Sequence, residues 1–263
     1  MSVLILQNEI VHYEVLGRGK PLLFLHGWVG SWRYWMATMQ AASISFRTYA
    51  LDLWGFGDTA KTPSSYSLEQ QINLIDLFME EMGIVKLALI GHGMGAIVGA
   101  HFAIRNQRSV DRLLAVGLPE GSQSLNQRLY TSPPVELAEW LLVRTTDSEA
   151  VRVEAPKTDG RAIQQSLANL GAMVGSPLVE NLCAPSLFIY GQNDPLILAP
   201  NLAETYSTLP EHMHQILFEG SGHFPMLDEP SKFNRLLADF LALGSGVSPR
   251  QLQLKEEWKR RVR

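Results

Sequence analysis

The chain has 263 residues, of which 46% are hydrophobic and 18% charged, and its formal net charge is −4. This length allows one or two domains with a sizeable core, and the composition excludes a disordered chain. The net charge gives no reason to expect nucleic acid as a partner, and a lone cysteine, Cys183, excludes an intrachain disulfide. Six basic residues and two glutamates give residues 250–263 a charge of +4, which leaves −8 for the preceding 249.

Targeting and membrane-spanning patterns are not expected in this sequence. Residues 1–10 contain no Lys or Arg and only a short apolar run, unlike a signal peptide. Residues 87–104 are free of formal charge, but four glycines and two histidines interrupt them. A membrane span normally needs about 20 predominantly apolar residues, so a strand followed by a helix explains this stretch better. We therefore expect a cytoplasmic protein.

Strands and helices are predicted to alternate along most of the chain. Short apolar or β-rich runs predict strands at residues 9–16, 22–25, 48–53, 87–90, 113–116, 186–190 and 215–218. Apolar spacing and capping residues predict helices at residues 31–40, 67–82, 94–106, 201–208 and 231–243. Such alternation favours a mainly parallel sheet covered by helices on both faces.

The alternation breaks between residues 119 and 185. This segment shows no comparable strand, and helical stretches at 135–144 and 161–174 are separated by residues 147–160. A connection of this length is too long for a simple loop, so we expect a small helical lid. The predicted organisation is a core of residues 1–118 and 186–243, a lid at 119–185, and a linker with a basic extension at 244–263.

A very tight turn is predicted where the strand at 87–90 meets the helix at 94–106. The segment Gly91-His92-Gly93-Met94-Gly95 supplies the small residues that such a turn needs. Turns of this kind normally present a serine in the pattern G-x-S-x-G. The segment resembles the nucleophile elbow of the α/β-hydrolase superfamily, with Gly93 at the nucleophile position. Two origins fit this glycine: a deliberate knock-out, or natural loss or reassignment of function.

Four further segments resemble motifs of the same superfamily, in the same order along the chain. They are His26-Gly27-Trp28 for the oxyanion loop, the Asp52–Asp58 loop followed by Thr59, the Tyr190–Pro195 loop for the triad acid, and the Ser221–Pro225 loop for the triad histidine. The resemblance implies an α/β-hydrolase fold with a mostly parallel eight-stranded sheet and a small helical lid. The alternative, a nucleotide-binding sheet, would need a glycine-rich turn that residues 26–30 match poorly.

The resemblance also implies the roles of the site residues. Asp194 and His223 would be the acid and the histidine of a triad, and the backbone N–H groups of Trp28 and Met94 would form the oxyanion hole. The histidine would have no hydroxyl to activate at Gly93, so serine-type hydrolysis is not expected from this chain. Glycine adopts positive φ without the strain that costs other residues about 1–3 kcal/mol, so it should stabilise the turn.

Three functions stay open at this point. The first is a hydrolase of carboxylic esters or related acyl compounds whose nucleophile is absent. The second is a non-hydrolytic enzyme, of the lyase or cofactor-free oxygenase type, that uses the pair of His223 and Asp194 as a general base. The third is a ligand-binding protein without activity. Glu120 is a second position for the acid, and Cys183 is interpreted as a packing residue.

The loops around the motifs indicate a small, mostly apolar substrate or ligand, because few charged residues fall in them. The residues expected to line the pocket are His26, Gly27, Trp54, His92, Trp140 and Phe224. We expect no cofactor and no metal, since His12, His101, His212 and His214 show no metal-ligand spacing with carboxylates. The tryptophans have packing within the core as their alternative role.

The basic extension has its own pattern. Leu254, Trp258 and Val262 recur every four residues, so a helix would place them on one face. We expect the extension to dock on the acidic body of the same chain or a neighbouring one. Contact with an anionic membrane surface is a less favoured alternative.

Overall fold

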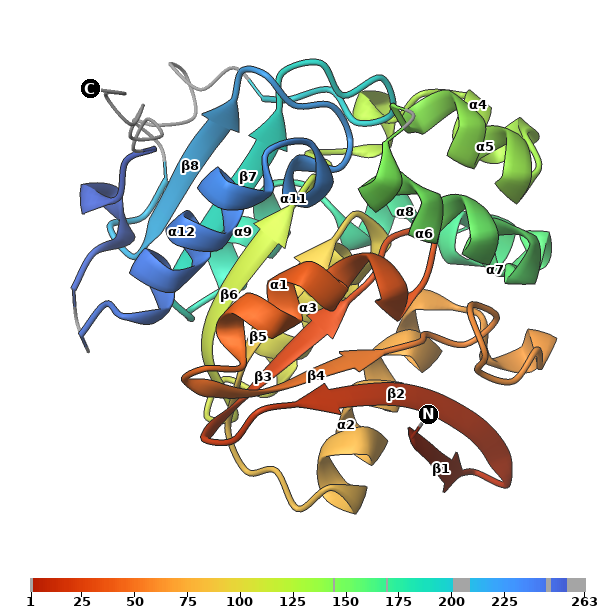
Figure 1. Ribbon diagram of the computed structural model, residues 1–263, viewed down its shortest axis with the longest axis horizontal. Coiled ribbons are helices and arrows are strands. Elements are labelled where there is room, and N and C mark those ends of the chain that lie inside the picture. Colours follow the sequence, from red (N-terminus) through yellow and green to blue (C-terminus); the bar gives the residue numbers. More distant parts are fainter. Residues whose placement is uncertain (1, 144, 169, 201–208, 245–246, 255–263) are drawn as a thin grey trace, which may run out of the picture.

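A computed structural model describes residues 2–143, 145–168, 170–200, 209–244 and 247–254 (Figure 1). Its eight strands form one sheet in the order β1-β2-β4-β3-β5-β6-β7-β8. They are β1 (Ser2–Leu6), β2 (Glu9–Leu16), β3 (Lys20–Leu25), β4 (Phe46–Leu51), β5 (Leu87–His92), β6 (Val110–Val116), β7 (Ser186–Gly191) and β8 (Met213–Phe218). All neighbouring pairs from β4 to β8 are parallel, while β2 is antiparallel to both β4 and β1. This confirms the mostly parallel eight-stranded sheet.

Seven of the strands lie where apolar runs predicted them, and β1 was not among the predicted runs. Its side chains alternate between partly buried and exposed, with Val3 and Ile5 facing solvent. The central strands β5 and β7 are instead buried along their whole length, as strands covered on both faces must be. The apolar run of β1 was noted only as too short for a signal peptide, and apolar residues on both of its faces hide the alternation that marks an edge strand.

Helices cover both faces of the sheet. The helices α1 (Met36–Ala42) and α12 (Pro230–Leu241) lie side by side on one face, and α2 (Leu68–Glu81) and α3 (Met94–Arg105) pack together on the other (Figure 1). The side chain of Ser67 accepts a hydrogen bond from the N–H of Gln70, which confirms the predicted start of α2. The stretch at residues 87–104 is β5 followed by α3, as expected. Among the described residues, no helix is long and apolar enough to cross a membrane.

The segment between β6 and β7, called the helical insert below, contains short helices and, in its described residues, no named strand. Its α-helices are α4 (Arg128–Thr131), α5 (Pro134–Leu141), α6 (Thr146–Glu154), α7 (Gly160–Leu167), α8 (Leu170–Met173) and α9 (Ser176–Asn181). Residues 147–160 were predicted to separate two helices, but α6 and a short 3-10 helix, η4 (Ala155–Lys157), occupy most of them. Reciprocal hydrogen bonds between Thr145 and Ser148 cap α6.

The insert is fastened to the core along α6 and α7. The carboxylate of Glu154 forms ion pairs with Arg33 and Lys157, and the ammonium of Lys157 also pairs with Asp58 on the core. The N–H of Asp159 donates to the carbonyl of Gly55 at 2.9 Å. Figure 1 shows α4 to α8 gathered on the side toward which the arrowheads of β3 and β6 point. The insert therefore stands beside the carboxyl ends of the strands.

The start of the C-terminal extension packs on the fold instead of standing beyond it. The Ser248 hydroxyl donates to the carbonyl of Glu211, and the guanidinium of Arg250 contacts the Glu211 carboxylate and the backbone before β8. The side chain of Leu252 is buried, and its carbonyl lies 3.1 Å from Nε2 of His214. The described start of the predicted extension therefore contacts the body of the same chain. The predicted helical face at 254, 258 and 262 falls mostly outside the described residues, as does the helix predicted at 201–208.

Candidate active site

The carboxyl ends of the parallel strands bring the predicted motifs to one edge of the sheet. His26 follows β3, Gly93 follows β5, Asp194 lies three residues after β7, and His223 lies in the loop after β8. Since crossover connections keep these strands parallel, loops that are up to about 200 positions apart in sequence meet there. The topology alone therefore explains why these four segments share a site.

The turn between β5 and α3 depends on its glycines. A Cβ at Gly91 would lie 2.3 Å from the carbonyl oxygen of Gly95, and a Cβ at Gly95 would lie 2.5 Å from the carbonyl of Leu25. Gly93 has φ 51° and ψ −112° and caps the N-terminus of α3. A Cβ there would meet only the indole of Trp28, at 3.3 and 3.4 Å, and Cα of Gly27. The first two positions are closed to any side chain, whereas position 93 accepts a small one at the cost of backbone strain.

His223 and Asp194 form a buried hydrogen-bonded pair. Nδ1 of His223 lies 2.9 Å from Oδ2 of Asp194. The other oxygen, Oδ1, accepts from the N–H groups of Leu196 and Ile197 at 2.8 and 3.1 Å, which fixes the carboxylate. The opposite ring nitrogen, Nε2 of His223, is buried and has no partner among the described residues. A buried, unpartnered nitrogen on an oriented imidazole is suited to accept a proton from a bound molecule.

Glu120, the second position proposed for the acid, is exposed, and Nδ1 of His223 faces Asp194. Cys183 is exposed as well, so its interpretation as a packing residue is wrong.

Two backbone N–H groups border the turn. Within the described part of the chain, the N–H groups of Trp28 and Met94 donate to no other backbone carbonyl. Met94 is the first residue of α3, where amide groups point outward and the helix dipole is positive. The Trp28 ring is fully buried, and its Nε1–H donates to the hydroxyl of Ser166 on α7 at 2.9 Å. The backbone of the described residues therefore leaves both N–H groups unused.

His92 and Phe224 pack against the His223 ring, with centroid distances of 4.5 and 4.9 Å. Burial, and then the nearby charge of His223, hold the pKa of His92 well below its ordinary value. His92 is therefore neutral at physiological pH.

His26 is occupied by backbone groups. Its Nδ1 lies 2.8 Å from the carbonyl of Gly27, and its Nε2 accepts from the N–H of Leu53 at 3.0 Å. Burial lowers the pKa of His26, which keeps the ring neutral and able to make both bonds. The side chain thus fastens the loop after β3 to the loop after β4, and it has no polar atom left for a ligand.

The other predicted pocket residues differ in their surroundings. Gly27 lies against His92, since a Cβ there would be 3.1 Å from Nδ1 of that ring. Trp54 is almost fully buried, and its backbone N–H and carbonyl both bond the amide of Gln71. Trp140 lies on α5, where the guanidinium of Arg128 stacks over its ring at 4.9 Å. This cation–π contact joins two residues of the insert.

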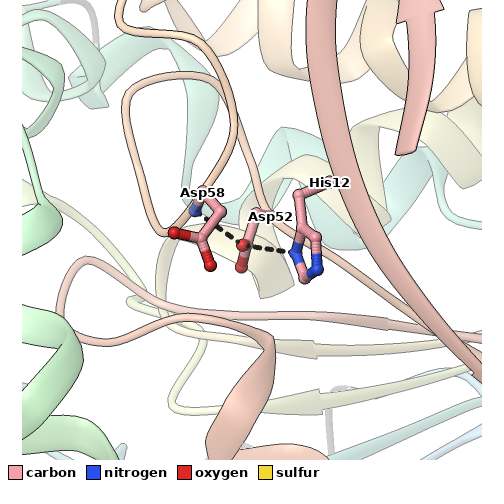
Figure 2. A group of neighbouring side chains, drawn as sticks. All are labelled: His12, Asp52 and Asp58. Atoms are coloured by element: carbon pink, nitrogen blue, oxygen red, sulfur yellow. Dashed lines mark hydrogen bonds and ion pairs between the residues drawn. The ribbon is translucent and has the colours of Figure 1, made fainter. Parts of the chain in front are cut away.

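A second polar cluster joins His12 to the Asp52–Asp58 loop, and the sequence analysis did not connect His12 with that loop. Pairing of β2 with β4 places His12 next to Asp52, and Figure 2 shows Asp52 between His12 and Asp58. Nδ1 of His12 and the N–H of Asp58 both bond Oδ2 of Asp52, at 2.9 and 3.0 Å. Burial lowers the pKa of His12, but the hydrogen bond and charge of Asp52 outweigh it and leave that pKa raised.

The ligand atoms of these three side chains lie within 4.8 Å of one another, the spacing of a metal site, which the separation of His12 from the carboxylates in the sequence did not predict. Their contacts favour a structural role. The second oxygen of Asp52 already accepts from the N–H of Trp32 at 2.9 Å, and the ammonium of Lys157 lies 2.9 and 3.1 Å from the two oxygens of Asp58. A cation would have to displace these bonds, and we assign the cluster to holding β2, the loop after β4 and the insert together.

Comparison with known proteins places the chain in a family. The family model described as "Alpha/beta hydrolase family" matches residues 22–236. A soluble epoxide hydrolase from Corynebacterium sp. (strain C12) is 32% identical over 111 residues, which span 42% of this chain and 39% of that enzyme. A pimeloyl-[acyl-carrier protein] methyl ester esterase from Vibrio cholerae is 22% identical over 254 residues, which span 88% of this chain and 97% of the esterase.

Solved structures agree at the level of the fold. A mutant of an N-acyl homoserine lactonase with serine replaced by glycine, complexed with N-hexanoyl homoserine lactone, superposes with a TM-score of 0.77 at 20% identity. The match covers 91% of this chain and 96% of the lactonase. The family model, the hydrolases among the relatives and the strand order all agree, and the chain belongs to the α/β-hydrolase family.

Proposed function

We propose that this chain carries an ester- or acyl-binding site of the α/β-hydrolase type in which Gly93 takes the nucleophile position. One observation carries the proposal: His223 is oriented by Asp194 while its Nε2 is buried without a partner in the described residues. The turn at Gly93, with φ 51°, begins α3 beside this pair. The geometry suits a nucleophile elbow, and the side chain that would attack is missing.

The remaining groups support recognition of a carbonyl compound. The free N–H groups of Trp28 and Met94 would hold its oxygen, and oriented donors of this kind stabilise developing negative charge. The side chains of Trp28, Met94 and Phe224 are apolar and buried, which favours a small, mostly apolar ligand. The helical insert would act as the lid. The lactonase variant with a serine-to-glycine change that holds an acyl lactone supports ligand binding without a serine hydroxyl.

Without a hydroxyl at position 93, no acyl group can be transferred to this turn. The pair of His223 and Asp194 would instead act on water, with Nε2 taking a proton as the oxygen attacks the carbonyl. General-base catalysis alone is worth about 10²–10⁴-fold, well below what a complete triad supplies. We therefore expect the native chain to bind acyl compounds and to hydrolyse them slowly.

A second candidate function rests on the same free nitrogen. Nε2 of His223 would also suit removal of a proton from an acidic carbon, which requires a base and no nucleophile. This candidate predicts turnover of an acidic carbon substrate that is lost in His223→Ala. It also predicts that a serine at position 93 adds nothing to that turnover.

The test of the proposed function is a gain of activity in Gly93→Ser, measured with p-nitrophenyl acetate and butyrate. Gly93→Ala is the matched control, because it adds the same Cβ and the same backbone strain without a hydroxyl. We expect Gly93→Ser to hydrolyse both esters about 10²-fold or more faster than Gly93→Ala. This gain should vanish in the double variant Gly93→Ser/His223→Ala. A folded Gly93→Ser that is no faster than Gly93→Ala would contradict the proposal.

A further inference from the structure

A tyrosine that no motif singled out lies directly beneath the site. Tyr34 belongs to the 3-10 helix η1 (Trp32–Trp35) and is 2% exposed. Its ring meets the rings of His92 and Phe224 edge-on, at centroid distances of 5.7 and 5.4 Å. Since His92 and Phe224 both pack on His223, the tyrosine is one ring removed from the catalytic-type pair.

The hydroxyl of Tyr34 lies between two groups of the site. The backbone N–H of Gly27 points at it from 2.7 Å, and Nδ1 of His92 lies 2.9 Å away. An amide N–H can only donate, so the phenol oxygen accepts from Gly27. The phenol can still either donate its hydrogen to Nδ1 of His92 or accept from it, so the protonation of the His92 ring decides the direction of the second bond.

The backbone carbonyl of His223 fixes the proton on the His92 ring. Nε2 of His92 lies 2.9 Å from this carbonyl, which can only accept, so Nε2 carries the ring hydrogen. In a neutral imidazole Nδ1 is then an acceptor, and the hydroxyl of Tyr34 donates to it. Burial raises the pKa of Tyr34 and lowers that of His92, so both side chains stay neutral near pH 7. The three hydrogen bonds therefore run one way, from Gly27 through Tyr34 and His92 to His223.

This chain of bonds joins three loops that otherwise come from distant parts of the sequence. Gly27 precedes the N–H of Trp28, His92 precedes Gly93, and the carbonyl of His223 belongs to the residue with the free Nε2. All the participating side chains are buried, so water does not replace a lost bond easily. A shift of about 1 Å in such a site can cost about 10²-fold in rate.

We propose that Tyr34 is a positioning residue, which bridges the N–H of Gly27 and Nδ1 of His92 and thereby holds the His223 loop and the Gly27–Trp28 peptide in register. It touches no reacting atom and acts through His92. The expected effect of Tyr34 on the reaction rate rests on the proposed function. The expected effect of Tyr34 on His92 and His223 does not depend on any activity.

The test is nuclear magnetic resonance of the full chain labelled with ¹⁵N-histidine, at pH 7.5. Long-range ¹H–¹⁵N spectra distinguish the two neutral tautomers of each ring, and His92→Gln assigns the His92 signals. We expect wild-type His92 to be the Nε2–H tautomer. In Tyr34→Phe, Nδ1 of His92 loses its donor while Nε2 keeps its bond to the His223 carbonyl, and we expect a shifted Nδ1 signal at His92 and a shifted Nδ1 proton signal at His223.

Tyr66→Phe is the matched control, since Tyr66 is fully buried and its hydroxyl makes one bond, to Asp159, away from the relay. It should leave the His92 and His223 signals as in the wild type. A wild-type His92 protonated on Nδ1 would overturn the proposal without any variant. Tyr34→Phe spectra that match the wild type at both histidines would overturn it as well, because a purely structural tyrosine changes only the unfolding free energy.

A rate measurement separates this proposal from the function itself. If Gly93→Ser is an esterase, adding Tyr34→Phe should lower its kcat about 10-fold or more with KM nearly unchanged. An unchanged kcat in the double variant would overturn the positioning role. If Gly93→Ser is inactive, the proposed function fails, while the His92 and His223 signals still decide the role of Tyr34.

Discussion

At the scale of single residues, Gly93 shows how a backbone angle and a chemical role are linked. Its φ of 51° and ψ of −112° suit glycine, and its Cβ position is 3.3 Å from the Trp28 ring. We expect Gly93→Ala to lower the unfolding free energy by about 1–3 kcal/mol, because alanine is strained at this combination of φ and ψ. Urea unfolding followed by circular dichroism measures it. A Gly93→Ala variant as stable as the wild type would mean that the turn is not strained.

Single residues also mark the limit of prediction from sequence. The motifs around Gly93, Asp194 and His223 were recognised because each lies within a few residues of a predicted strand, so a short stretch of sequence is enough to identify it. Tyr34 was not, because its partners Gly27 and His92 reach it through the packing of η1 under the sheet edge. The pocket role assigned to His26 relied on proximity in sequence, which does not tell that two backbone groups occupy its nitrogens.

At the scale of elements, the helical insert is bound to the core through the carboxylate of Glu154. Its side chain is 1% exposed and lies 2.6 Å from Nε of Arg33 and 3.1 Å from Nζ of Lys157. The side chains of Arg33 and Lys157 both reach solvent, whereas the Glu154 carboxylate does not. Removing a cation therefore leaves a buried charge, while removing the carboxylate leaves cations that water can solvate. Helix α6 itself escaped prediction because its charged sequence offers little apolar periodicity, although Thr145 and Ser148 form a recognisable cap.

This asymmetry gives a prediction for two single variants. Arg33→Met leaves the buried carboxylate with one cation, and we expect a loss of about 1–3 kcal/mol in unfolding free energy. Glu154→Gln leaves two cations that water can solvate, and we expect a loss below about 1 kcal/mol. Urea unfolding of both variants under one set of conditions compares them. A larger loss for Glu154→Gln than for Arg33→Met would contradict the assignment.

At the scale of the whole molecule, buried histidines set the response to acid. The pKa values of His26, His92 and His214 are lowered, mainly by burial, while that of His12 is raised beside Asp52. A histidine with a lowered pKa stabilises the fold above its unfolded pKa of about 6.5, and this contribution is lost as the pH falls. His12 acts in the opposite sense, since its contribution is full below about pH 6.5 and is lost as the pH rises through its raised pKa.

We therefore expect the unfolding free energy to fall between pH 6.5 and pH 5, by up to about 1.4 kcal/mol per pH unit for each histidine kept neutral. Urea titrations at pH 5.0, 5.75, 6.5 and 7.5 measure the slope. His12→Asn should leave this slope nearly unchanged, because the contribution of His12 is already full below pH 6.5. Between pH 6.5 and pH 7.5 the variant should lose the fall in stability that His12 contributes as it deprotonates in the folded state. A stability that is flat or rises toward pH 5 would show that these rings are not held neutral.

The whole fold was the most predictable level. Motifs in a fixed order after successive strands specified the parallel sheet and the edge where the loops meet, because parallel strands bring their carboxyl ends together. The edge strand β1 was missed, since its pairing with β2 is a contact that only the assembled sheet provides. The docking of the extension on the same chain was expected from charge, but the residues that carry it, such as Leu252 on His214, were not.

The central claim is that position 93 is the nucleophile position of an otherwise assembled site. Its most direct measurement is the intact mass of Gly93→Ser after brief exposure to a p-nitrophenyl ester or a fluorophosphonate. We predict one covalent adduct per chain, mapped by peptide analysis to position 93, and none in the wild type, Gly93→Ala or Gly93→Ser/His223→Ala. A folded Gly93→Ser that stays unmodified, or that is modified equally without His223, would contradict the claim.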